Sequence, residues 1–291
     1  MVSEWIFELG GEQPQLAQAE LTELLATTDC ELAVTRQNEL QLHCILARSV
    51  PPELLARLGM VRSGGELAAT GSLEELEAAA TVINLDGARF AVRCAPGGLE
   101  LQEVNKRLGA ILAKHGRVDL EQPTIIVRVF QGEKLQLLLE REATGYRRCL
   151  EHHLNRRPRF APVSLPPRLA RAMVNLALPS GVGKLLDPFC GTGGLLIEAD
   201  DCDLDASGSD LDGKMIDATR ENLRYFGFTA TVELGDAAAV VQQMRPAAIV
   251  TDPPYGRSAS TARDIPMPPA PLPPGRVCGG SPDSLGTATP N

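Results

Sequence analysis

Several features are missing from this sequence, and each absence excludes a class of protein. No run of about 18 apolar residues occurs, so we expect no membrane-spanning helix. The N-terminal segment carries Glu4 and Glu8 but no basic stretch, so it does not form a secretory signal. The seven cysteines are odd in number and contain no C-x-x-C pair, which argues against zinc sites and disulfides. We therefore expect a cytoplasmic protein with reduced thiols, no metal ion and no membrane contact.

Positive charge is also scarce. The net charge is −9 and there are only five lysines, which argues against indiscriminate binding of nucleic acid over the whole surface. Arginines nevertheless gather in one segment, 141–160, with the sequence "REATGYRRCLEHHLNRRPRF". The planar guanidinium group binds phosphate and stacks on bases, and Tyr146 and Phe160 lie among the arginines. We predict that this segment contacts RNA, with a solvated linker helix as the competing interpretation. The residues expected to contact RNA are Arg147, Arg148, Arg156, Arg157 and Arg159.

The first 143 residues alternate short strands and helices, which predicts two α+β domains, 1–69 and 70–143. In the first, "EWIFEL" and "ELQLHCILA" are typical of strands and "QPQLAQAELTELL" of a helix. A helix over 71–80 follows, where Ser72 and Glu75 have the spacing of a capping box. From about 86 to 141 the order is strand, helix, strand, strand. Both blocks suggest small antiparallel sheets with helices on one side.

A different pattern begins after the linker, 144–163. Five segments alternate helix and strand in the way that is typical of a parallel, doubly wound sheet over 164–258. These segments are "SLPPRLARAMVNLAL", "KLLDPFCGTGGLLIEA", "DASGSDLDGKMIDATRENLRYFG", "TATVELGDAAAV" and "AAIVTDPPYG". The predicted fold class is therefore α/β, an incomplete Rossmann-like sheet preceded by α+β domains.

Three aspartates follow three successive predicted strands. The first strand ends at Asp187 and is followed by a glycine turn that includes Gly191 and Gly193, which lets the backbone approach a ligand closely. Asp210 ends the next strand at a spacing suited to accepting ribose hydroxyls, and Asp236 after the third could accept from an adenine amino group. Taken singly, each aspartate is more often a helix cap than a ligand, and dinucleotide sites use similar spacing.

The sequence Asp252-Pro253-Pro254-Tyr255 distinguishes a methyl donor from a dinucleotide as the bound cofactor. The amino group of a nucleobase is a poor nucleophile because its lone pair is delocalised into the ring. A carboxylate at Asp252, with the Pro253 carbonyl, could bind the N–H groups and direct the lone pair at a methyl donor. The two prolines fix the backbone, so these acceptors are preorganised. Tyr255 offers a face on which an extruded base can stack.

Together these motifs resemble a class I S-adenosyl-L-methionine-dependent N-methyltransferase. With the upstream residues included, residues 1–258 resemble the archaeal family that methylates the N2 amino group of guanosine 10 in tRNA. The resemblance depends on "DPFCGTGGLLIEA", "GSDLDGKMI", "TDPPYG" and "RPRFAPVSLPPRLARAMVNLA". It implies a ferredoxin-like domain, then a THUMP domain that helps bind tRNA. The implied cofactor-binding residues are Asp187, Phe189, Gly191, Gly193, Asp210 and Asp236, and Asp252 to Tyr255 would hold the guanine.

One cysteine and two histidines near these motifs have other common roles, and two other functions are compatible with the sequence. Cys190 is interpreted as a small residue beside the cofactor, because N-methylation needs no covalent adduct with the base. His152 and His153 have no partner pattern for metal binding or acid–base chemistry and are interpreted as linker residues. The alternative functions are methylation of ribosomal RNA or DNA, and a non-catalytic tRNA-binding protein that uses the N-terminal domains. We expect a monomer.

The C-terminal residues depart from the family pattern. Residues 264–291 hold eight prolines and four glycines without apolar periodicity, so we expect a disordered tail over 259–291. The family's sheet has seven strands, whereas this sequence predicts four. Residues from about 264 are therefore expected not to be family sequence, as a frameshift or a misassigned gene end would produce. The fourth strand would then be an exposed apolar edge, which predicts a marginally stable, insoluble or inactive product.

Overall fold

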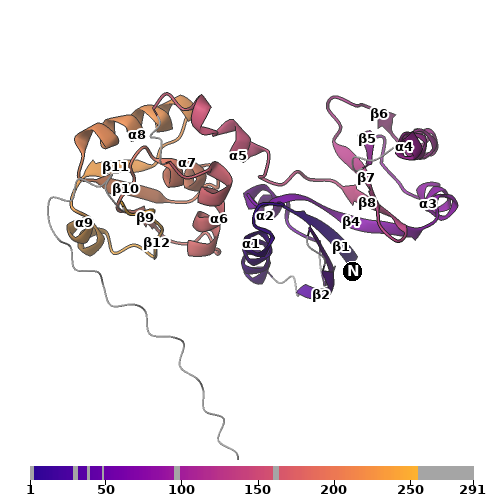
Figure 1. The fold of residues 1–291 in the computed structure, drawn as a ribbon, viewed down its shortest axis with the longest axis horizontal. Helices are drawn as coiled ribbons and strands as arrows, with labels where there is room; N and C mark the ends of the chain where they lie inside the picture. The colour runs from indigo at the N-terminus through magenta and orange to yellow at the C-terminus, as the bar shows by residue number, and fades with distance from the viewer. Residues whose placement is uncertain are drawn as a thin grey trace, which may run out of the picture. The chain divides into compact units, whose positions relative to one another are not determined.

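The computed structural model describes residues 3–28, 32–37, 40–47, 49–94, 99–159 and 164–254 (Figure 1). The predictions for Tyr255 and for the tail over 259–291 lie outside these residues. Within the described part of the chain, no helix combines the length and the apolar character needed to cross a bilayer.

The N-terminal part forms a single eight-stranded mixed sheet with four α-helices. The sheet order is β2-β3-β1-β4-β8-β7-β5-β6. The elements are β1 (Ser3–Leu9), α1 (Pro14–Ala26), β2 (Leu32–Gln37), β3 (Gln41–Leu46), α2 (Pro52–Arg57), β4 (Val61–Gly71), α3 (Leu73–Ala80), β5 (Arg89–Cys94), α4 (Leu99–Leu112), β6 (Arg117–Val118), β7 (Ile125–Gln131) and β8 (Leu135–Glu140).

The prediction of two separate antiparallel sheets is wrong, because β4 joins the two blocks. This 11-residue strand pairs antiparallel with β1 along one part and with β8 along another, and it crosses the boundary predicted between residues 69 and 70. The sheet is also not purely antiparallel, since β5 pairs parallel with β6 and β7. The strand was missed because its sequence, "VRSGGELAATG", lacks side chains where neighbours approach. A Cβ atom on Gly64 would lie 2.5 Å from the Phe7 ring.

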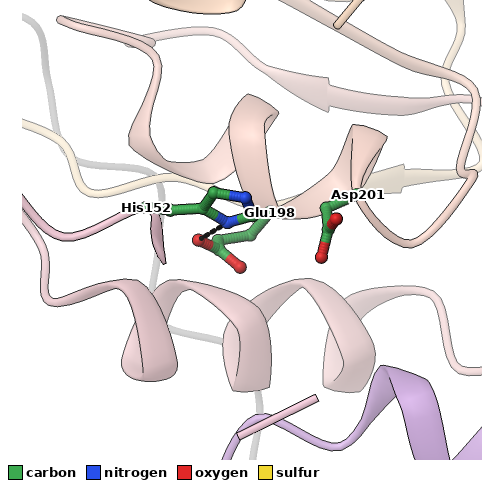
Figure 2. Close-up of side chains that lie close together, drawn as sticks. All are labelled: His152, Glu198 and Asp201. Atoms are coloured by element: carbon green, nitrogen blue, oxygen red, sulfur yellow. Dashed lines mark hydrogen bonds and ion pairs between the residues drawn. The ribbon is translucent and has the colours of Figure 1, made fainter. Parts of the chain in front are cut away.

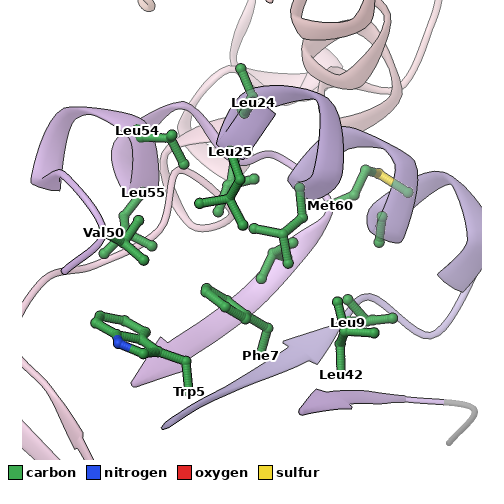
Figure 3. Close-up of a cluster of buried hydrophobic side chains, with 14 of the residues drawn as sticks. Trp5, Phe7, Leu9, Leu24, Leu25, Leu42, Val50, Leu54, Leu55 and Met60 are labelled. Carbon is green, nitrogen blue, oxygen red and sulfur yellow. The ribbon is translucent and has the colours of Figure 1, made fainter. Parts of the chain in front are cut away.

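The core of the first block lies between β1 and the helices α1 and α2. Figure 3 shows Trp5, Phe7 and Leu9 on β1, with leucines of α1 and α2 facing them. The Trp5 and Phe7 rings are stacked, with centroids 5.7 Å apart. The helix α1 begins at a proline, which is favourable in the first turn, and its buried residues recur on one face.

The second block has its own core, built from α3, α4 and the inner face of β5, β7 and β8. The capping box predicted at the start of α3 is confirmed. The Ser72 hydroxyl accepts a hydrogen bond from the Glu75 amide at 3.3 Å, and the Glu75 carboxylate accepts one from the Ser72 amide at 2.7 Å. These bonds satisfy two donors that a helix start would otherwise leave without partners.

The C-terminal part contains the parallel sheet that the alternation predicted, which confirms the fold class. Its strand order is β11-β10-β9-β12, and all three pairings are parallel. In the described part of the chain, β12 pairs with β9 alone. The elements are α5 (Arg148–Glu151), η1 (Leu154–Arg156), α6 (Pro167–Ala177), β9 (Leu185–Asp187), α7 (Gly194–Asp200), β10 (Ala206–Asp210), α8 (Gly213–Phe226), β11 (Thr231–Leu234), α9 (Ala237–Met244) and β12 (Ala248–Ile249).

The helix α6 belongs to two hydrophobic cores. Ala172 packs in the core of the first N-terminal block, together with β1, α1 and α2. Ala170 and Val174, with Leu178 just after the helix, pack in the core of the parallel sheet, with α7 and β9. One helix therefore contacts both the N-terminal sheet layer and the elements that carry the glycine turn.

Candidate functional site

A fixed glycine bend connects β9 to α7. Gly191 and Gly193 have φ angles of +51° and +84°, which side-chain-bearing residues rarely adopt. A Cβ atom on Gly193 would lie 2.7 Å from the Thr219 methyl group of α8. The Thr219 hydroxyl in turn donates to the Gly191 carbonyl at 2.7 Å. The sequence thus places glycine where both the backbone conformation and the neighbouring helix require it.

Asp210, at the end of β10, is hydrogen-bonded to this bend. One of its oxygens accepts from the Gly191 amide at 3.0 Å, and the other accepts from the Asp212 amide at 2.9 Å. The two predicted site residues therefore lie together although they are 19 positions apart. Because each carboxylate oxygen has two lone pairs, the side chain retains capacity to accept hydrogen bonds from a ligand.

Asp187 is the most perturbed acid of the site. Its pKa is raised to about 7, chiefly by burial and in smaller part by the negative charges of Asp210 and Asp252, against a hydrogen bond from the Phe189 amide at 3.2 Å. The three carboxylates follow three neighbouring strands, β9, β10 and β12. Since like charges oppose one another at this edge of the sheet, a cationic ligand would be favoured there.

Asp236 is a helix cap, the role that is the more common one for such an aspartate. It precedes α9, and one of its oxygens accepts from the amides of Ala238 and Ala239 at 3.0 and 3.2 Å. It follows β11, which neighbours β10 in the sheet, so it lies at the same edge as Asp210. Its contact with adenine remains a prediction.

Asp252 follows the last described strand. Val250 before it is buried and its backbone amide donates to the Leu186 carbonyl of β9 at 3.0 Å, which continues the strand pairing towards the loop. Asp252 itself is half-buried, and Pro253 and Pro254 are exposed. The loop thus begins beside Asp187, and the Asp252 side chain is partly accessible to solvent.

Cys190 remains a thiol in this environment. Burial raises its pKa to about 12, and the charges of Asp187 and Asp210 add to the shift. A thiolate is the nucleophilic form of cysteine, so this residue is poorly suited to covalent catalysis. Cys190 packs closely on β10, because a Cβ atom placed on Gly208 would lie 2.9 Å from the Cβ atom of Cys190.

The five arginines predicted to contact RNA do not share one environment. Arg147 and Arg156 are exposed, whereas Arg148 pairs with Asp201 and Arg159 pairs with Glu221 at 2.8 Å. The last of the five, Arg157, differs from the prediction because it is only 4% exposed.

The Arg157 side chain is held inside the protein. Its Nε donates to the His152 carbonyl at 3.0 Å, and its other two nitrogens have no hydrogen-bond partner among the described residues. This burial could not be predicted from the sequence, because the residue lies in a segment rich in charge. Contact with RNA is therefore retained as a hypothesis for the other four arginines only.

His152 is not the unpartnered linker residue that the sequence suggested. It is buried, and its Nδ1 lies 3.0 Å from a carboxylate oxygen of Glu198 on α7, 46 positions later (Figure 2). With Asp201 the two residues form a group that could hold a metal ion. However, the Arg171 guanidinium lies 2.7 Å from Glu198 and also contacts Asp201. Arginine thus supplies the positive charge that these carboxylates require.

Comparison with known proteins adds independent information. Residues 155–266 match the model of a family described as an RMKL-like methyltransferase domain. The tRNA (guanine(10)-N2)-dimethyltransferase of Methanothermobacter thermautotrophicus is 34% identical over 267 residues, which cover 87% of this chain and 78% of the relative. The enzyme of the same name from Pyrococcus abyssi is 33% identical over 273 residues, covering 88% and 80%. The crystal structure of TrmN from Thermus thermophilus superimposes with a TM-score of 0.53 at 26% identity, covering 87% and 80%.

Proposed function

Because the chain belongs to the tRNA (guanine(10)-N2)-dimethyltransferase family, we propose that it transfers methyl groups from S-adenosyl-L-methionine to the exocyclic N2 amino group of guanosine 10 in tRNA. The observation that supports this most strongly is the joint placement of the glycine bend and the acids. Asp210 is bonded to the bend at Gly191, and the charges of Asp210 and Asp252 act on Asp187.

The described residues fit this cofactor. Gly191 leaves the space beside the bend free of side chains, because a Cβ atom there would meet nothing within 4 Å, and Gly193 lets Thr219 of α8 pack against the bend. Asp210 can accept from ribose hydroxyls, and Asp236 from the adenine amino group. The acids at the strand ends favour a ligand with positive charge. When bound, the cofactor supplies an electrophilic methyl group.

The target amino group would be held by the loop after β12. The Asp252 carboxylate and the Pro253 carbonyl accept its two N–H bonds, which localises the nitrogen lone pair and aims it at the methyl donor. The proline pair keeps both acceptors in place before the base arrives, so little reorganisation is needed during the reaction. Tyr255 would stack on the guanine, and Phe189 would border the cofactor.

The test is a methylation assay with radiolabelled S-adenosyl-L-methionine. Unmodified tRNA, the same tRNA with guanosine 10 replaced by adenosine, ribosomal RNA and duplex DNA are offered separately. We expect label in the first substrate alone, and equal label in the first two would refute the assignment to position 10. Asp252→Asn should strongly reduce the label, because a neutral amide oxygen is a weaker acceptor for the N–H bond than a carboxylate is. The exposed Asp217→Asn is the matched control.

A non-catalytic tRNA-binding protein is the alternative that the sequence left open. It predicts that no substrate is labelled and that tRNA affinity is the same for Asp252→Ala and the unchanged chain. The methylation assay separates the two cases, because turnover occurs only in the enzyme, whereas phosphate contacts give tRNA binding a steep salt dependence in both.

A further inference from the structure

Buried polar side chains connect α6 to the N-terminal helices. Glu20 of α1 is fully buried, and one of its oxygens accepts from the Met60 amide at 2.8 Å. The other oxygen accepts from the Gly59 amide at 2.9 Å and from the Asn175 side chain of α6 at 2.7 Å. A buried carboxylate is costly unless it is hydrogen-bonded, so these three donors are needed where they are.

Asn175 uses its whole carboxamide in this junction. Besides the bond to Glu20, its Nδ2 donates to the Arg57 carbonyl at 2.9 Å, and its Oδ1 accepts from the Arg57 Nε at 3.2 Å. The remaining nitrogens of Arg57 donate to the carbonyls of Pro179 and Leu178 at 2.9 and 3.1 Å, just beyond the end of α6. Every partner of the Asn175 side chain therefore comes from α1 or α2, and Arg57 holds the end of α6 in return.

The same helix is tied to the catalytic side through Arg171. This side chain is fully buried, and its Nε donates to Glu198 of α7 at 2.8 Å. It also contacts Asp201, which directly follows α7. The helix α7 begins at Gly194, directly after the glycine bend. The loop after α2 packs directly on this arginine, since a Cβ atom on Gly59 would lie 2.6 Å from the Arg171 side chain.

We propose that Asn175 is a positioning residue for tRNA methylation. It fixes α6 against α1 and α2, and α6 fixes α7 and the glycine bend, so that tRNA held by the N-terminal part presents its target guanosine at Asp252. This inference rests on the proposed function. Asn175 touches neither substrate, and it acts through the distance that it maintains between the two binding surfaces.

The first test compares kinetics and cofactor binding in Asn175→Ala. We expect kcat/KM for tRNA to fall by about tenfold or more, because the truncation leaves buried groups of Glu20 and Arg57 without their partner and loosens the junction. The Kd for S-adenosyl-L-methionine should stay within about twofold, since the bend is untouched. Val50→Ala, which removes methyl groups from the core shared with Ala172, is the control for lost stability alone. If both variants lower kcat/KM equally at equal loss of stability, Asn175 is merely structural.

The second test does not depend on catalysis. Spin labels are attached through unnatural ketone-bearing residues at Val82 and Asp217, which are 81% and 83% exposed. We expect a narrow distance distribution in the otherwise unchanged chain and a broader one when Asn175→Ala is added. An unchanged distribution would overturn the inference whether or not the chain methylates tRNA. Glu20→Gln, which keeps the side-chain size, repeats the test from the other side of the junction and should broaden the distribution too.

Discussion

The raised pKa of Asp187 makes a quantitative prediction for the variant Asp187→Asn. The ordinary pKa of an aspartate is 3.8, and burial raises that of Asp187 to about 7. The folded protein therefore binds a proton at Asp187 where the unfolded chain does not. This contribution to stability is fully present below about pH 4 and is lost as the pH rises through about 7. A shift of about three units corresponds to about 4 kcal/mol in total.

The measurable window lies around the folded-state pKa. Between pH 5.5 and 8.5, the free energy of unfolding should fall by about 2 kcal/mol because of Asp187 alone. Asp187→Asn cannot ionise, so its stability should lack this component and exceed that of the unchanged chain at pH 8.5. Urea unfolding followed by circular dichroism across this range provides the measurement. Asp217→Asn, at an exposed position, should keep the full pH dependence.

Cofactor binding should report the same ionisation. A cationic ligand near Asp187 favours the carboxylate, so affinity for S-adenosyl-L-methionine should rise as the pH increases towards 7. Binding near pH 6.5 should release a proton, which calorimetry detects as a heat that depends on the ionisation enthalpy of the buffer. If Asp187→Asn shows the same pH dependence of stability and the same proton release, Asp187 is not the group that titrates, and the reasoning is refuted.

Three further predictions follow from the site and its surroundings. Gly193→Ala should lower stability by roughly 1–3 kcal/mol and weaken cofactor binding, because its φ is +84° and its Cβ would strike α8; Gly213→Ala, with open space, should do neither. Glu198→Gln should lower the free energy of unfolding by roughly 1–3 kcal/mol in thermal or urea melts, because it leaves the buried Arg171 guanidinium with Asp201 as its one charged partner among the described residues. Arg147→Ala combined with Arg156→Ala should weaken tRNA binding in filter-binding assays. The slope of log K against log salt concentration should become shallower, by the equivalent of about two phosphate contacts, and cofactor affinity should not change.

Local signals in the sequence predicted where the strands of the parallel sheet end and where the glycine bend lies. The strand that ends at Asp187, the glycines of the bend and Asp210 are close in sequence to the turns that they determine. The bend and Asp210 lie together because β9 and β10 pair in parallel, and the alternation of strand and helix already predicts this pairing. The capping box at Ser72 is likewise a local pattern with a local result.

Long-range relations were not predictable in the same way. The pairing of His152 with Glu198 joins residues 46 positions apart, and no spacing rule connects them. Burial of Arg157 is equally hidden, because a charged segment gives no sign of which side chain turns inward. The strand β4 was missed for a further reason. Its glycines are required because side chains and backbone of the neighbouring strands approach closely there. The strand therefore carries little apolar periodicity of its own.

The shared strand β4 has a consequence for anyone who divides this protein into fragments. A cut between residues 69 and 70 would fall inside the strand. It would leave β8 with an open backbone edge in one fragment and the residues of β4 that pair with β8 open in the other. Unpaired edges recruit other chains, so either fragment should aggregate when expressed alone. The two N-terminal blocks therefore form one cooperative folding unit, and proteolysis of the native chain should release them together rather than singly.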